Sequence, residues 1–92
     1  MKKEFFKPVS FEELLMLTGG YGVTRLEVPG GKALINKTLA ESGLRKNDIT
    51  VLAIIRGNDT IPNPPADAII HKSDELVLFG KLENIRDRIY EV

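Results

Sequence analysis

Arg56 and Asn58 follow an apolar run, residues 49–55, and are the side chains of this sequence best suited to hold a small molecule. A guanidinium binds a phosphate or carboxylate through two parallel hydrogen bonds, which makes Arg56 a candidate anion donor. An arginine at the end of a strand also commonly pairs with an acid or is simply solvated, and this interpretation stands beside the first. Asn58 and Asp59 equally suit a tight turn.

The other polar groups with reactive chemistry lie together at residues 71–74. His71 is the single histidine, a residue type that can modulate a ligand site, although a surface or structural role is the alternative. Ser73 and Asp74 follow, but neighbours along an extended chain rarely converge on one reacting atom. We expect Asp74 to stabilise the turn into the last strand. No nucleophile has an activating base and no metal-ligand spacing is present, so neither an enzyme nor a metal centre is predicted.

The composition limits the class of protein. The chain has 92 residues, enough for one small domain with a modest core, which favours association with a partner. Lys and Arg number 13 and Asp and Glu number 13, so the net charge is zero. Nucleic-acid binding needs a surplus of cations, and a nucleic-acid partner is therefore not predicted. The absence of cysteine excludes disulfides, thiolate metal sites and a cysteine nucleophile.

The hydropathy of the sequence predicts a soluble protein. No apolar run approaches the roughly 20 residues that span a bilayer, and no signal peptide follows the basic start. We therefore expect a cytoplasmic chain with no direct membrane insertion, which still allows it to serve as the soluble part of a membrane system.

The first segment, residues 1–19, has a helical pattern. Ser10 and Glu13 form a capping box, the apolar residues 14–17 continue the helix, and Gly19 with Gly20 ends it. This helix is very apolar for its length. We therefore expect residues 1–19 to be a lead-in and a short helical arm that docks on another surface, such as a second copy of the chain.

The remaining residues alternate between strand and helix patterns. Residues 23–28 predict a half-buried strand, residues 34–42 a helix closed by Gly43, and residues 49–55 a central strand with both faces covered. A short edge strand at Thr60 and Ile61, a buried strand at 76–79 and a terminal helix at 82–92 follow. These elements predict an α+β fold with a small mixed sheet of about four strands and helices packed on it in two layers.

Four motifs follow one another in order: Leu34-Ile35-Asn36-Lys37-Thr38-Leu39, Val51-Leu52-Ala53-Ile54-Ile55-Arg56, Ile61-Pro62-Asn63-Pro64 and Ser73-Asp74-Glu75-Leu76-Val77-Leu78-Phe79-Gly80. Taken together, residues 20–89 resemble the C-terminal domain of regulators of potassium conductance, the RCK_C or TrkA-C family. Asn36 and Ser73 stand where the family usually has glycine. Asparagine is the next most tolerant residue for left-handed backbone, so the turn at Asn36 is expected to survive.

The resemblance implies that residues 20–92 are a ligand-sensing domain that dimerises. Some similar domains bind cyclic di-AMP in the matching region of a dimer interface, and no cofactor is required. The apolar members of the implied site would flank a base, Arg56 would hold a phosphate and Asn58 would hydrogen-bond a base edge. The implied ligand-binding residues are Ile54, Ile55, Arg56, Asn58, Ile61 and Pro62. The nucleotide-binding half that many relatives carry ahead of this domain is missing, so NAD or ATP binding is not implied.

By the same resemblance, the chain would control a potassium or other monovalent cation transporter as a homodimer. Its partner would be a membrane transporter, a channel or an antiporter subunit, and the chain would reach the membrane only through that partner. A ligand bridging two copies would favour one arrangement of the subunits. The alternative hypothesis is a constitutive assembly domain without a ligand of its own.

Overall fold

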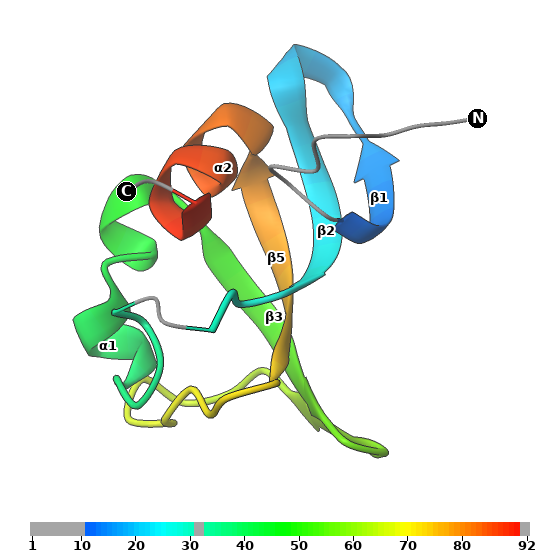
Figure 1. The fold of residues 1–92 in the computed structure, drawn as a ribbon. Coiled ribbons are helices and arrows are strands. Elements are labelled where there is room, and N and C mark those ends of the chain that lie inside the picture. The colour runs from blue at the N-terminus through cyan, green and yellow to red at the C-terminus, as the bar shows by residue number, and fades with distance from the viewer. Residues whose placement is uncertain (1–10, 31–32, 91–92) are drawn as a thin grey trace.

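The computed structural model describes residues 11–30 and 33–90 of the chain. Within these residues, strands dominate and two α-helices accompany them (Figure 1). Two short 3₁₀ turns lie between elements: Thr18–Gly20 between the first two strands, and Arg45–Asn47 between the first α-helix and the third strand. The elements are, in chain order, β1 (Phe11–Met16), β2 (Tyr21–Glu27), α1 (Leu39–Ser42), β3 (Thr50–Arg56), β4 (Asp59–Pro62), β5 (Glu75–Lys81) and α2 (Leu82–Tyr90).

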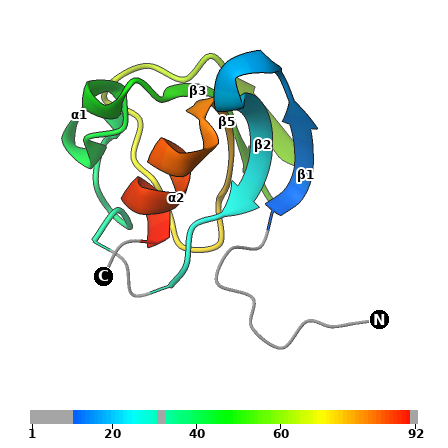
Figure 2. The same ribbon diagram turned by 90° about the horizontal axis from the view of Figure 1, so that it is seen from above.

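The strands form one sheet in the order β1-β2-β5-β3-β4, and every neighbouring pair is antiparallel. Both helices lie on the same side of this sheet (Figure 2). The predicted α+β class with two layers is therefore confirmed. The predicted mixed sheet of four strands is wrong in detail, because β1 adds a fifth strand and no described pair is parallel. The middle strand is β5, whereas β3 lies one place from the edge.

The core lies between the sheet and its helices, and strand alternation fills it. On β2, Thr24 and Leu26 are buried, as the sequence pattern predicted, and on β5 Leu76 and Leu78 are fully buried. Ile54 is the fully buried residue of β3. Side chains of opposite parity point to the other face of the sheet, where no described helix lies, and are half-buried or exposed. The expectation that both faces of β3 are covered is therefore wrong.

The predicted N-terminal helix is wrong for the residues that the structure describes. Phe11–Met16 is the edge strand β1, paired antiparallel with β2. The helix-forming residues of this segment are overridden by the ladder with β2, which satisfies their backbone groups and adds a strand to the sheet. Gly19 and Gly20 do end the segment: both have positive φ, 73° and 81°, in the turn between β1 and β2. Ser10, the predicted cap, lies outside the described residues.

The predicted helix at 34–42 is shorter than expected, because α1 begins only at Leu39. Thr38 caps it: its side chain accepts a hydrogen bond from the Glu41 amide, and the Glu41 carboxylate accepts one from the Thr38 amide. This reciprocal pair fixes the helix start five residues later than the apolar spacing suggested. The pKa of Glu41 is lowered, first by the hydrogen bond from the Thr38 backbone amide to its carboxylate and then by the Thr38 side chain. Gly43 closes the helix with a φ of 81°, as predicted.

The terminal helix α2 packs as its apolar spacing predicted, with Ile85 and Ile89 fully buried. It also holds α1 in place, because Arg88 donates from both Nε and Nη2 to the carbonyl oxygen of Ser42. Val92, the last residue of the predicted apolar stripe, lies outside the described residues. Among the described residues, no helix is both long enough and apolar enough to cross a membrane.

Candidate functional site

The candidate site lies where the β3–β4 hairpin meets the connection that leads into β5. Arg56 and Asp59 are the last paired residues of the hairpin, so Gly57 and Asn58 form a two-residue turn. Gly57 has a φ of 64°, a backbone conformation that tight hairpin turns require and that glycine adopts without steric cost. The turn lies at the tip of a hairpin that extends beyond the rest of the sheet, and Asn58 there is exposed (Figure 1).

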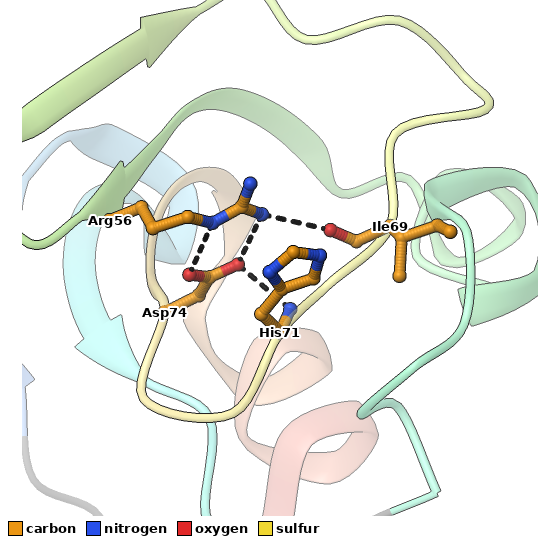
Figure 3. A network of polar contacts seen from close by, with 4 residues as sticks. All are labelled: Arg56, Ile69, His71 and Asp74. Carbon is orange, nitrogen blue, oxygen red and sulfur yellow. Dashed lines mark hydrogen bonds and ion pairs between the residues drawn. The ribbon is translucent and has the colours of Figure 1, made fainter.

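Arg56 is held by Asp74 through two parallel hydrogen bonds. Arg56 Nε donates to Oδ1 at 2.9 Å, and Nη2 donates to Oδ2 at 2.8 Å. Nη2 also donates to the carbonyl oxygen of Ile69 at 3.0 Å. Figure 3 shows the other terminal nitrogen, Nη1, pointing away from Asp74 with no contact drawn to it. Of the two interpretations left open for Arg56, the structure therefore shows the ion pair, and among the described residues Nη1 has no hydrogen-bond partner.

Asp74 is the buried partner of this pair. Its side chain is 1% exposed, whereas that of Arg56 is 37% exposed. Oδ2 also accepts a hydrogen bond from the His71 amide at 2.8 Å, and the Asp74 amide donates to the His71 carbonyl at 3.0 Å. Asp74 thus stabilises the turn before β5, as the sequence predicted. Its second role, as the counter-ion of Arg56, was missed.

The electrostatics of the pair favour both charged forms. Burial of Asp74 opposes ionisation, but the hydrogen bonds from Arg56 and from the His71 backbone outweigh it, and the pKa of Asp74 is lowered. The hydrogen bond to Asp74 raises the pKa of Arg56, which therefore stays protonated. Arg56 and Asp74 therefore form an ion pair with no net charge, and their two hydrogen bonds fix the orientation of the guanidinium.

The connection at residues 69–74 is anchored to the segment before α1. The Asn36 amide donates to the Ile70 carbonyl at 2.6 Å, and the Ile70 amide donates to the Lys37 carbonyl at 2.8 Å. Asn36 and Ser73 have φ values of 71° and 74°. The left-handed turn expected at Asn36 is therefore confirmed, and Ser73 adopts the same conformation. Ile70 is fully buried, while His71 beside it is exposed.

The structure separates the six predicted site residues into different environments. Ile54 is fully buried and pairs with Ile61 on the helix-covered side of the sheet, where Ile61 packs partly against the core. The alternation of the strands places Ile55 and Pro62 on the uncovered side, where Ile55 is half-buried and Pro62 is exposed. Arg56 and Asn58 lie at the hairpin end. Within one chain, Ile54 has no accessible surface, so its part in a site would be to support the strand.

A separate shallow groove lies between α1, the start of β3 and the segment after β4. Its volume is about 130 Å³, and its lining includes Leu39, Leu44, Arg45, Val51, Asn63 and Pro64. None of the six predicted residues lines it. In the part of the chain that the structure describes, no group of His, Cys, Asp and Glu side chains is arranged to hold a metal ion.

The model of the TrkA-C domain matches residues 23–89. The strands β3, β4 and β5, the hairpin with Arg56 beside its turn and the connection into β5 lie within that match, whereas β1 lies outside it. The chain belongs to the TrkA-C domain family.

Three curated relatives share most of this chain but are much longer. The chain is 42% identical over 86 residues to a probable alpha-L-glutamate ligase of Rhodopirellula baltica, a match that covers 94% of this chain and 21% of the relative. It is 35% identical over 88 residues to the K(+)/H(+) antiporter subunit KhtT of Bacillus subtilis, covering 94% and 53%. Potassium channel protein 1 of Methanocaldococcus jannaschii is 36% identical over 78 residues, covering 84% and 23%. The chain thus spans about half of one relative and under a quarter of the others.

Two solved structures show the same fold. The RCK domain of GsuK superposes with a TM-score of 0.61 at 29% identity, covering 75% of this chain and 15% of that one. The RCK_C domain dimer of BusR from S. agalactiae, solved in complex with c-di-AMP, superposes with a TM-score of 0.65 at 19% identity. That match covers 78% of this chain and 91% of the BusR domain, and at this identity it supports the fold alone.

Proposed function

We propose that this domain is a regulatory, ligand-sensing module of a potassium or other monovalent cation transport system and that it acts as a dimer. The observation that carries the proposal is Arg56: it stands at the end of β3, fixed by buried Asp74, with Nη1 directed outward. A fixed cationic donor beside an exposed hairpin suits recognition of a small anion. The sensing unit is residues 20–92, and Phe11–Met16 adds the edge strand β1 to its sheet.

The similarity to an antiporter subunit and to a potassium channel protein supports potassium transport as the regulated process. Both relatives contain further sequence, so the membrane partner of this chain is a proposal. The ligase relative shares only about a fifth of its length with this chain, and ligase activity is not carried over. We assign no enzymatic activity to the domain, and we place it in the cytoplasm, at the membrane only through its partner.

The proposed ligand is cyclic di-AMP, bound between two copies of the domain. The BusR domain dimer in complex with c-di-AMP supports this choice, because it has the same fold. Arg56 would donate from Nη1 to a phosphodiester oxygen, and Asn58 would hydrogen-bond the edge of a base. Ile55 and Pro62 would flank the base, with Ile54 and Ile61 supporting the strands behind them. A ligand that contacts both copies stabilises one arrangement of the dimer, and the membrane partner responds to that bias.

The alternative is a constitutive assembly domain that binds no ligand. Its support is the edge strand β1, where Leu15 is 60% exposed and Met16 is 54% exposed, followed by Leu17 at 45%. Apolar side chains on an open strand edge favour pairing with another chain. Under this alternative the domain dimerises to the same extent with and without ligand.

Thermal unfolding with cyclic di-AMP separates the two functions. At a ligand concentration of 100 Kd, a single site stabilises the folded state by about 2.7 kcal/mol. For a domain of this size, each kcal/mol shifts the midpoint by about 4–8 °C, so the midpoint should rise by roughly 11–22 °C. Arg56→Lys keeps the charge, but one ammonium group cannot bond both oxygens of Asp74 and still present a fixed donor to the ligand, so it should abolish most of this rise.

Arg86→Lys makes the same exchange at an exposed position of α2, away from the site, and should retain the full rise. Light scattering adds the second readout: a clean monomer at micromolar concentration counts against both functions. No midpoint shift for the wild-type chain at high ligand concentration would remove cyclic di-AMP as the ligand, and a constant dimer would then favour assembly.

A further inference from the structure

The guanidinium of Arg56 makes all its hydrogen bonds within the described residues through Nε and Nη2. Nε has one N–H and Nη2 has two, and these bond both oxygens of Asp74 and the carbonyl of Ile69. The two N–H groups of Nη1 have no hydrogen-bond partner among the residues that the structure describes. An arginine that binds a phosphate as a fork uses two nitrogens together. Asp74 and the Ile69 carbonyl already use all the N–H groups of Nε and Nη2, so a fork to a ligand is not available here (Figure 3).

We propose that Asp74 is a positioning and specificity-determining residue: it presents Arg56 to an anion through Nη1 alone. The inference rests on the proposed function, because it concerns how the same site selects its ligand. It goes beyond that function because it assigns a role to a residue that contacts no ligand and that the sequence placed only in a turn.

Asp74 is suited to this role because it cannot move without breaking the connection that holds it. Its side chain is 1% exposed, and Oδ2 also accepts from the His71 amide. Two backbone hydrogen bonds tie Ile70, on the same connection, to residues 36 and 37. The carboxylate is thus fixed on the protein side, and the guanidinium takes its direction from it. A lone arginine with 37% of its side chain exposed would sample several rotamers.

The pair also changes what the site recognises. Because Arg56 and Asp74 neutralise each other, the attraction for a distant anion is weak, and binding depends on an acceptor oxygen placed at Nη1. A singly charged phosphodiester offers such an oxygen. A compact polyanion such as pyrophosphate gains more from an unpaired guanidinium, which offers full charge and a free fork. Asp74 should therefore favour the phosphodiester over the polyanion.

Asp74→Asn tests this inference because charge and geometry predict opposite results. The substitution makes the site more positive, so electrostatics alone predicts tighter binding of cyclic di-AMP. Positioning predicts weaker binding, by at least about tenfold, since a charge-assisted contact loses its direction. The same variant should bind inorganic pyrophosphate several-fold more tightly than the wild-type chain. Asp67→Asn makes the identical change at an exposed position of the same connection and should alter neither affinity.

Unchanged or tighter binding of cyclic di-AMP by folded Asp74→Asn would overturn the inference. A second measurement needs only the wild-type chain, so it holds even where that variant fails to fold. In side-chain ¹⁵N NMR spectra, cyclic di-AMP should shift the Nη1 signal of Arg56 and leave the Nε signal in place. A large Nε shift, showing that the ligand takes the edge held by Asp74, would contradict the positioning role.

The proposed ligand and the positioning role can fail separately. If cyclic di-AMP leaves Arg56 unperturbed while pyrophosphate shifts Nη1 alone, the ligand assignment fails and the positioning role stands. If cyclic di-AMP binds and shifts Nε, the ligand assignment stands and the positioning role fails. If neither compound perturbs Arg56, both are overturned.

Discussion

Two arginine–carboxylate pairs flank the start of β5, and they differ mainly in the burial of the acid. Arg25 Nε donates to Glu75 Oε1 at 2.7 Å, and Arg56 bonds both oxygens of Asp74. The arginine side chains are equally exposed, 36% and 37%. The side chain of Glu75 is 21% exposed and that of Asp74 is 1% exposed. Adjacent residues of one chain thus make two pairs of very different character.

The alternation of the sheet explains the difference. Arg25 and Glu75 have the parity opposite to the core residues Leu26 and Leu76, so they lie on the uncovered face. Solvent screens that pair, and either partner can be replaced by water. Asp74 precedes β5 and is enclosed by the connection that it stabilises. Both pairs contain an arginine and a carboxylate, so the residue types do not distinguish them. Arg56 is the candidate ligand donor because its partner Asp74 is buried and holds the guanidinium through two hydrogen bonds.

The largest expected effect is on stability. Arg56→Ala leaves the carboxylate of Asp74 buried without its partner and should lower the free energy of unfolding by about 2–3 kcal/mol. Arg25→Ala should cost less than about 1 kcal/mol, because the acid it leaves can be hydrated. Urea unfolding at neutral pH and fixed chain concentration measures both. Equal costs for the two variants would show that burial of the acid does not distinguish the pairs.

The pH dependence of stability should be traceable to Asp74. Its pKa is lower in the folded than in the unfolded chain, so the unfolded state binds more protons as the pH falls. The contribution of Asp74 is complete above its unfolded pKa of about 4 and is lost as the pH falls through the lower, folded value. The difference in unfolding free energy between the wild-type chain and Asp74→Asn should therefore shrink below about pH 4. A difference that stays constant down to pH 2 would exclude the ion pair as its source.

The smallest expected effect concerns the backbone that carries Asp74. Ser73 has a φ of 74°, which costs a residue with a Cβ more than it costs glycine, so Ser73→Gly should stabilise the fold by about 0.5 kcal/mol. Asn36→Gly, at a φ of 71°, should gain less because asparagine tolerates this region better. Thermal unfolding of both variants measures the difference. Destabilisation by Ser73→Gly would indicate that the Ser73 side chain, rather than its backbone, matters.

The sequence predicted the elements whose local pattern agrees with their packing. The alternation around Leu26 and the spacing of Ile85 and Ile89 specified β2 and α2 because each pattern matches the face that is buried. The strand β1 was mistaken for a helix because Leu15 and its neighbours form helices readily, and only pairing with β2 makes them a strand. The ion pair joins Arg56 and Asp74, which are 18 residues apart in the chain. A local sequence pattern could not predict it, because the contact depends on both the β3–β4 turn and the turn before β5.

The direct test of the central claim is the stoichiometry of cyclic di-AMP binding by isothermal titration calorimetry. The account predicts saturable heat with one ligand for every two chains, because the bound molecule bridges two copies through Arg56 of each. Arg86→Lys, on the exposed side of α2, should give the same stoichiometry, and Arg56→Lys should give little or no heat. One ligand for each chain, or no heat from the wild-type protein at high concentrations of both components, would contradict a bridged sensing site.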